Sequence, residues 1–135
     1  MSGQQLLTEA KNTVFHLKRV EQRNINPYAS FANQMIGLIG DNKISSRAEV
    51  LEYTRLSYPR PGLNRQWRVF GEVLEKNLRN SLSKEDILLF FGYLKRLLTI
   101  EGKKQADEWN KGRERKYENP YKRDNRPQWN GKKKR

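Results

Sequence analysis

The sequence predicts an all-α protein: a compact bundle of about five helices followed by a basic, largely disordered C-terminal tail. Apolar residues recur at intervals of three and four over most of the first hundred residues, which is the spacing of one face of a helix. No run of five or more residues alternates apolar with polar side chains, as a half-buried strand would. The 135 residues have room for one domain, so we assign 1–102 to the bundle and 103–135 to the tail.

The first two helices are separated by a short polar stretch. The first is expected over about 4–23, and its apolar stripe consists of Leu6 or Leu7, Ala10, Val14, Leu17 and Val20. Asn26 followed by Pro27 is typical of an N-cap residue and a proline in the first helical turn. A second helix is therefore expected to begin at Pro27, with Asn26 as its N-cap, and to continue to Gly40, where a glycine ends the apolar pattern.

A capping box opens the third helix. Ser46 is followed three residues later by Glu49, and at this spacing each side chain can satisfy a backbone N–H near the other residue. The helix has to end before the Tyr-Pro-Arg-Pro-Gly run at 58–62, because two prolines and a glycine favour a loop.

The fourth and fifth helices have the clearest patterns. The fourth is expected over about 63–80, and its apolar arc consists of Trp67, Phe70, Val73, Leu74 and Leu78. The fifth begins at Ser83, an N-cap residue that is followed by two acidic residues in the first turn. From Ile87 to Ile100 it is apolar nearly all round, so it is expected to be the central and most buried helix.

The charge of the chain indicates a polyanionic partner. The formal net charge is +13, and residues 103–135 contain 13 Lys or Arg against five Asp or Glu, so the tail carries +8 and residues 1–102 carry +5. The tail has no Leu, Ile, Val, Met or Phe, so it is expected to stay mobile until a partner orders it. Cations interleaved with aromatic rings are typical of segments that bind phosphates and exposed bases. The rings are Trp109, Tyr117, Tyr121 and Trp129.

Basic residues of the bundle add further candidate contacts. Four cations of the fourth helix fall within about 80° of one another at 100° per residue, interrupted only by Glu72, and a phosphate backbone can follow such a row. These four, the helix-four row, are Arg65, Arg68, Lys76 and Arg79. A looser cluster on the first helix consists of Lys11, Lys18, Arg19 and Arg23. The remaining candidate contacts are Arg60, Lys95, Arg96, Arg113, Arg115, Lys116, Lys122 and Arg123.

Catalysis and metal binding are not indicated. The absence of Cys excludes disulfides, thiol catalysis and cysteine zinc sites, and the single histidine, His16, is expected to be structural. No glycine loop for phosphates, serine elbow or metal-ligand spacing occurs, so we expect no enzyme activity and no cofactor. No signal pattern or long apolar run is visible, so a cytoplasmic location is expected, or a nuclear one in a eukaryote.

Residues 90–98 have the sequence Phe-Phe-Gly-Tyr-Leu-Lys-Arg-Leu-Leu and close the core of a small, basic, helical chain without catalytic groups. Over about 6–104 the chain thereby resembles the small helical subunits of multi-subunit class 1 CRISPR effector complexes. The resemblance implies a non-catalytic subunit, stacked in several copies along the belly of the complex, whose basic faces steer the target strand past the guide RNA. The matching surface is then the helix-four row.

The sequence therefore predicts a non-catalytic subunit of a ribonucleoprotein that binds RNA or single-stranded DNA. Its expected partners are nucleic acid, other protein subunits and further copies of itself, with no membrane. Two alternatives remain open. One is a protein-interaction adaptor whose tail folds on a partner. The other is a regulator that binds duplex DNA through a helix-turn-helix in the third and fourth helices, although their connection is longer than the usual turn.

Overall fold

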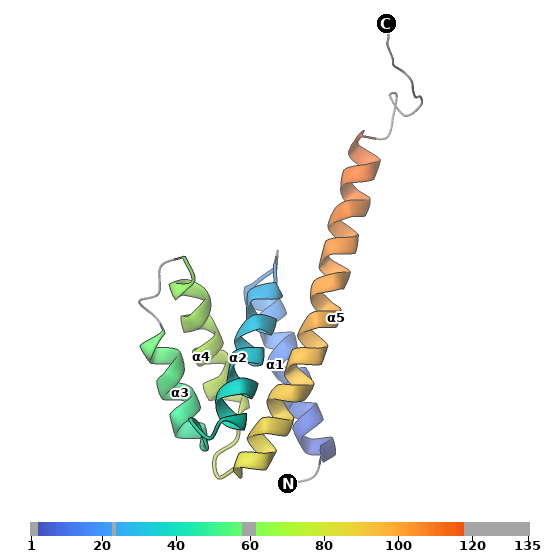
Figure 1. Ribbon diagram of the computed structural model, residues 1–135. Coiled ribbons are helices and arrows are strands. Elements are labelled where there is room, and N and C mark those ends of the chain that lie inside the picture. Colours follow the sequence, from blue (N-terminus) through green and yellow to red (C-terminus); the bar gives the residue numbers. More distant parts are fainter. Residues whose placement is uncertain (1–2, 23, 58–61, 118–135) are drawn as a thin grey trace, which may run out of the picture. The chain divides into compact units, whose positions relative to one another are not determined.

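The computed structural model describes residues 3–22, 24–57 and 62–117 (Figure 1). These ranges contain five α-helices and no β-strand, which confirms the predicted all-α fold. The helices are α1 (Gly3–Val20), α2 (Asn26–Gly40), α3 (Arg47–Leu56), α4 (Asn64–Asn77) and α5 (Lys84–Tyr117). The chain divides into two compact units, Met1–Gly102 and Lys103–Arg135, so α5 contributes to both of them.

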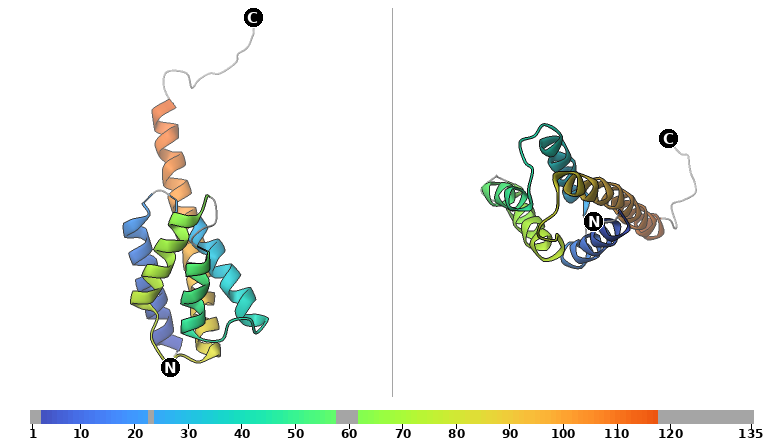
Figure 2. Two further views of the ribbon diagram at one scale, coloured as in Figure 1. Left: turned by 90° about the vertical axis from the view of Figure 1, so that its left-hand side faces the viewer. Right: turned by 90° about the horizontal axis from the view of Figure 1, so that it is seen from below.

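An aromatic cluster fills the centre of the first unit. In this unit α4 packs against α1, α2 and α3, and the helices surround a single core (Figure 2). The rings of Phe31 and Trp67 stack with their centroids 3.8 Å apart, and the ring of Phe70 meets both at a steep angle. Phe91 extends the cluster to α5. The predicted apolar arc of α4 is confirmed, because all of its members are buried: Trp67, Phe70, Val73, Leu74 and Leu78.

Two of the predicted helix caps are confirmed. The backbone N–H of Glu49 donates to the hydroxyl of Ser46 at 3.2 Å, and the Glu49 carboxylate accepts from the backbone N–H of Ser45 at 2.8 Å. Hydrogen bonds from Ser45 and Ser46 hold the pKa of Glu49 below its usual value, because they stabilise the charged carboxylate. At the start of α5, the backbone N–H of Asp86 donates to the hydroxyl of Ser83 at 3.1 Å.

The predicted N-cap of α2 is wrong by one residue. Asn26 is the first helical residue, and Ile25 occupies the cap position without a side-chain hydrogen bond. The side chain of Ile25 is fully buried, so packing places it at the cap even though isoleucine is a poor capping residue. Asn24 supplies the missing acceptor, since its side-chain oxygen accepts from the N–H of Asn26 at 3.1 Å.

A contact between helices ends α4 earlier than the sequence predicts. The helix stops at Asn77, and Leu78 adopts an extended conformation while its side chain stays buried. Arg47, the first residue of α3, donates to the backbone carbonyl of Leu78 at 2.7 Å and to that of Glu75 at 2.9 Å. A guanidinium group at these carbonyls satisfies acceptors that the helix leaves open and complements the negative end of its dipole.

The expectation that α5 is the most buried helix is also wrong. Its inner side is buried through Ile87, Phe90, Phe91, Leu94 and Leu98. On its outer side, Leu89 and Ile100 are 42% and 52% exposed. Within the first unit, the other helices lie on one side of α5 (Figure 2). The helix also continues past Gly102 to Tyr117, and the rest of the predicted tail, 118–135, lies outside the described residues.

Candidate nucleic-acid interface

The first member of the helix-four row, Arg65, is paired with a carboxylate. Its guanidinium lies 2.7 Å from Glu21, just after the end of α1, and the hydroxyl of Tyr28 donates to the same carboxylate oxygen at 3.1 Å. Burial and the adjacent negative charge raise the pKa of Tyr28 far above its ordinary value, so this hydroxyl stays protonated and remains a donor. Arg65 therefore links α4 to the α1–α2 connection and is neutralised there.

The last member of the row, Arg79, pairs with a buried carboxylate. It lies beyond the end of α4, and its guanidinium contacts Glu9 on α1. The side chain of Glu9 is only 9% exposed, and within the described part of the chain its Oε1 atom has no hydrogen-bond partner. A buried carboxylate without a counter-charge is costly, so the position of Arg79 is explained by the stability of the bundle.

We expect Arg79→Ala to lower the free energy of unfolding by about 1–3 kcal/mol, because it leaves the Glu9 carboxylate buried and unpaired. Urea unfolding followed by circular dichroism measures the loss. Lys76→Ala is the matched control, since Lys76 is an exposed cation of the same row for which no ion pair is seen among the described residues. Glu9→Gln combined with Arg79→Ala should recover part of the loss. Equal stabilities of the two single variants would contradict a structural role.

The remaining cations of the row share their surface with acids. Arg68 and Lys76 are exposed, and so are Glu72 and Glu75 between them along α4. Successive turns of this surface therefore alternate in sign, which reduces its attraction for a phosphate backbone. The sequence pattern placed four cations on one side of the helix. In the structure, two of them are paired: Arg79 with Glu9 of α1, and Arg65 with Glu21, which follows α1.

The looser cluster on α1 forms a more distinctive site. Phe15 is 63% exposed, and the guanidinium of Arg19 lies 5.9 Å from the centroid of its ring. Lys11 and Lys18 stand four residues before and three residues after Phe15, which places them on the same face of the helix. We call these four residues the α1 patch: Lys11, Phe15, Lys18 and Arg19.

Contacts with α5 hold one side of the α1 patch in place. Lys18 forms an ion pair with Glu101 at 2.8 Å. A hollow of about 280 Å³ lies between the two helices, and Phe15 and Leu97 are among the residues that line it. An exposed ring surrounded by cations offers a flat surface for a base and positive charge for the neighbouring phosphates.

Sequence reasoning identified the cations of this patch but missed its ring. Phe15 adjoins Val14 in a helix with many apolar residues, so it resembles one more core position. The signal was available, because Phe15 falls outside the stripe of Ala10, Val14 and Leu17 and has cations on both sides at helical spacing. His16, expected to be structural, is half-buried, and its Nδ1 atom lies 3.3 Å from the side-chain nitrogen of Asn77.

The other candidate contacts lie on α5 or outside the described residues. Lys95 and Arg96 are exposed on the part of α5 that belongs to the first unit. In the second unit, Trp109 is exposed. The backbone of α5 includes four further candidates whose side chains are not described: Arg113, Arg115, Lys116 and Tyr117. The candidates outside the described residues are Arg23, Arg60, Tyr121, Lys122, Arg123 and Trp129.

The described residues form neither a metal site nor a membrane-spanning helix. Among residues 3–22, 24–57 and 62–117, no cluster of three or more His, Cys, Asp or Glu is arranged to hold a metal ion. None of the helices in these ranges is long and apolar enough to span a membrane. No protein-family model, curated protein or solved structure matches the chain.

Proposed function

We propose that this protein is a non-catalytic, nucleic-acid-binding component of a ribonucleoprotein, which contacts RNA or single-stranded DNA through the α1 patch and the basic tail. The observation that carries the proposal is the exposed ring of Phe15 beside Lys11 and Arg19 on α1, with Lys18 held next to it by Glu101. The net charge of +13 supplies long-range attraction to any polyanion. A ring that stacks on a base adds a preference for strands whose bases are unpaired.

The length of the connection between α3 and α4 favours binding to single strands over binding to duplex DNA through a helix-turn-helix. Residues 57–63 separate the two helices, whereas a helix-turn-helix joins its helices by a turn of about three or four residues. The outer surface of α4 also alternates between Arg or Lys and Glu, whereas the negative phosphates along the groove of duplex DNA require a recognition helix whose face is not acidic.

We further propose that the ribonucleoprotein is a class 1 CRISPR effector complex, in which the chain is a small subunit. The resemblance of residues 90–98 and the all-α bundle support this narrower assignment. Purification from the native host at low salt, followed by sequencing of the bound nucleic acid, tests it. A discrete guide-like RNA is the expected result, and a heterogeneous pool of cellular RNA would contradict it.

Phe15→Ala should weaken the binding of a 20-nucleotide single strand by roughly 1–3 kcal/mol, which is about five- to 150-fold, because the base loses its stacking partner. Fluorescence anisotropy with labelled RNA and DNA strands measures the change. Leu56→Ala is the matched control, since Leu56 is an apolar side chain that is 72% exposed on α3. If both variants bind like the unmodified protein, Phe15 is not a stacking surface.

A protein-interaction adaptor is the second candidate function. It is favoured by the exposed apolar residues of α5, which have no role in the binding of phosphates. These residues line a groove along the outer side of α5.

A further inference from the structure

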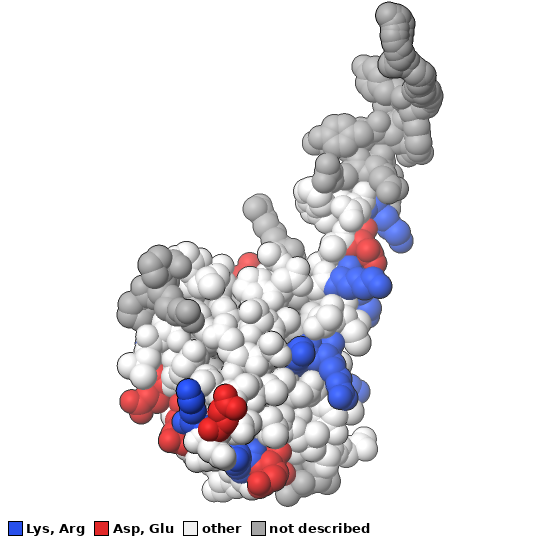
Figure 3. Space-filling view, in the orientation of Figure 1, with Lys and Arg blue, Asp and Glu red and all other residues white. Residues whose placement is uncertain are grey.

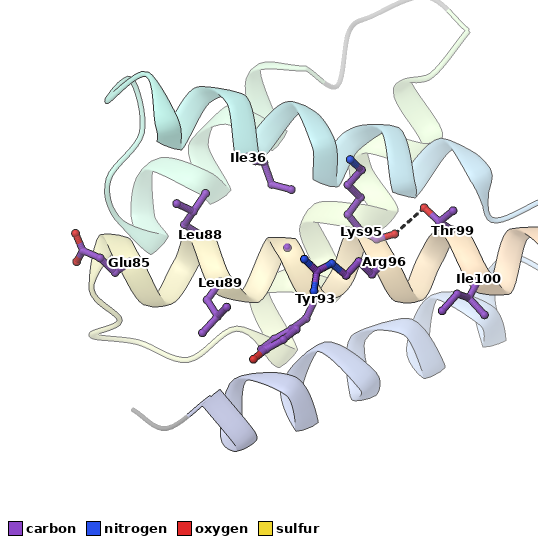
Figure 4. Close-up of a pocket in the computed structure, with 10 residues that line it drawn as sticks. Ile36, Glu85, Leu88, Leu89, Tyr93, Lys95, Arg96, Thr99 and Ile100 are labelled. Atoms are coloured by element: carbon purple, nitrogen blue, oxygen red, sulfur yellow. Dashed lines mark hydrogen bonds between the residues drawn. The ribbon is translucent and has the colours of Figure 1, made fainter.

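A groove runs along the outer side of α5 in the first unit. It has a volume of about 1000 Å³, and Ile36 of α2 forms one wall (Figure 4). Its other apolar residues come from α5 and include Leu88, Leu89, Tyr93 and Ile100. Figure 3 shows a broad surface of the unit with few charged side chains, with Lys and Arg on its right-hand border and side chains of both signs along its lower left border. Exposed apolar surface of this kind is stabilised when a partner removes it from water.

Gly92 lies in the middle of this groove and has no evident role inside the unit. A Cβ atom added at Gly92 would meet nothing within 4 Å. Gly102 differs, because a Cβ atom there would meet the side chain of Asn26 and the α1–α2 connection. Glycine favours the helix less than alanine does, so Gly92 weakens the monomer without relieving any internal contact. Its effect is to leave room for another helix to approach the backbone of α5 closely.

The charged residues of one copy's groove can pair with those of a second copy. Within the groove, Glu85 lies near the start of α5, and Lys95 and Arg96 lie about three turns further along the helix. When two α5 helices are aligned antiparallel about a twofold axis between residues 90 and 91, Glu85 of each copy stands opposite Arg96 of the other. The same alignment places Leu88 opposite Tyr93.

In that alignment Leu89 also stands opposite Gly92, so the larger side chain of one copy faces the open position of the other. A single register therefore pairs Glu85 with Arg96, brings Leu88 against Tyr93, and leaves space for Leu89 at Gly92.

We propose that the groove is the interface of a symmetric dimer, in which α5 of a second copy packs antiparallel against α5 of the first. Both copies use the same residues, so this contact by itself closes at two chains, and the stack of several copies that the CRISPR resemblance implies would need a second surface. The interface uses none of the α1 patch residues, and of the candidate nucleic-acid contacts its register uses Arg96, so the dimer and the proposed binding through the α1 patch can be tested separately.

Salt separates this interface from the proposed binding of nucleic acid. Two chains with a charge of +13 repel each other, and salt screens the repulsion, so the dimer should become tighter from 0.1 to 0.5 M NaCl. Nucleic-acid binding should weaken over the same range. Dimer affinity and nucleic-acid affinity should therefore change in opposite directions with salt, so one proposal can be contradicted without the other.

Sedimentation equilibrium of the full chain, treated with nuclease, tests the proposal. A monomer–dimer equilibrium is expected, and Leu89→Asp should raise its dissociation constant at least tenfold. Leu56→Asp is the control, because it introduces the same charge at an exposed apolar residue on α3 and should leave the dissociation constant unchanged. A chain that stays monomeric at high salt, or forms assemblies larger than a dimer, would overturn the proposal.

Two further variants test the register. Gly92→Ala should raise the melting temperature of the bundle, since alanine favours the helix, and yet weaken the dimer. Glu85→Arg should weaken the dimer, and Glu85→Arg combined with Arg96→Glu should restore it, because the exchanged charges still face each other. A Gly92→Ala variant that dimerises more tightly, or a double variant that does not recover, would exclude this antiparallel arrangement.

Discussion

Deletion of residues 105–135 should weaken the binding of a single-stranded oligonucleotide by on the order of 100-fold at 0.1 M salt, because most of the effect of such a tail is the release of counterions from phosphates. The deletion removes Trp109 and every cation of the tail except Lys103 and Lys104. The buried core should remain intact, since all of its members lie within residues 6–98.

The salt dependence of binding distinguishes the tail from the α1 patch. For a single strand, the logarithm of affinity falls with the logarithm of salt concentration, and the slope should become less negative by about 0.7 for each phosphate contact removed. The deletion should therefore flatten the slope, whereas Phe15→Ala should lower the affinity and leave the slope unchanged, because the ring carries no charge. Anisotropy titrations at four salt concentrations give both quantities. An unchanged slope after deletion would mean that the tail does not contact phosphates.

Substitution of Trp67 by alanine should have the largest effect on stability, a loss of about 3–5 kcal/mol in the free energy of unfolding. The ring is fully buried and stacks on Phe31 at an interplanar angle of 15°. Phe70 and Tyr53 contact it edge-on, so its removal leaves a cavity between α2, α3 and α4. Small domains are stable by only about 5–15 kcal/mol, so this variant should be partly unfolded at 37 °C.

Trp67→Phe provides the control for size and polarity. The smaller ring keeps the stack on Phe31, and it removes an indole N–H that is buried without a partner among the described residues. The unpaired N–H is itself a cost, so the phenylalanine variant should lose less than half as much stability as the alanine variant. Urea unfolding followed at 222 nm compares the two. Equal losses would show that the stack on Phe31 contributes little.

Local chemistry made most of the fold predictable. The caps at Ser46 and Ser83 involve residues three apart in the chain, so the sequence contains both partners of each hydrogen bond. The apolar arc of α4 is similarly a property of one helix. These features do not depend on where the other helices lie.

The errors arose where a distant residue decides the outcome. The guanidinium of Arg47 binds the end of α4 from the start of α3, and the burial of Ile25 sets the start of α2. Periodicity likewise shows that α5 is apolar, but it does not show how many neighbours cover the helix. The outer side of α5 thus became a groove that the sequence had assigned to the core.

The amino-acid sequence by itself determined the all-α class, most helix starts, and an excess of positive charge that favours a polyanion. The tertiary structure alone decided which of those charges remain available. Arg79 is held by Glu9 and Arg65 by Glu21, whereas Phe15 is left exposed beside Lys11 and Arg19. The physical reason is that a helical pattern fixes the direction of a side chain only around its own axis. Ion pairing and burial depend on the neighbouring helix, which is set by packing between residues far apart in the chain.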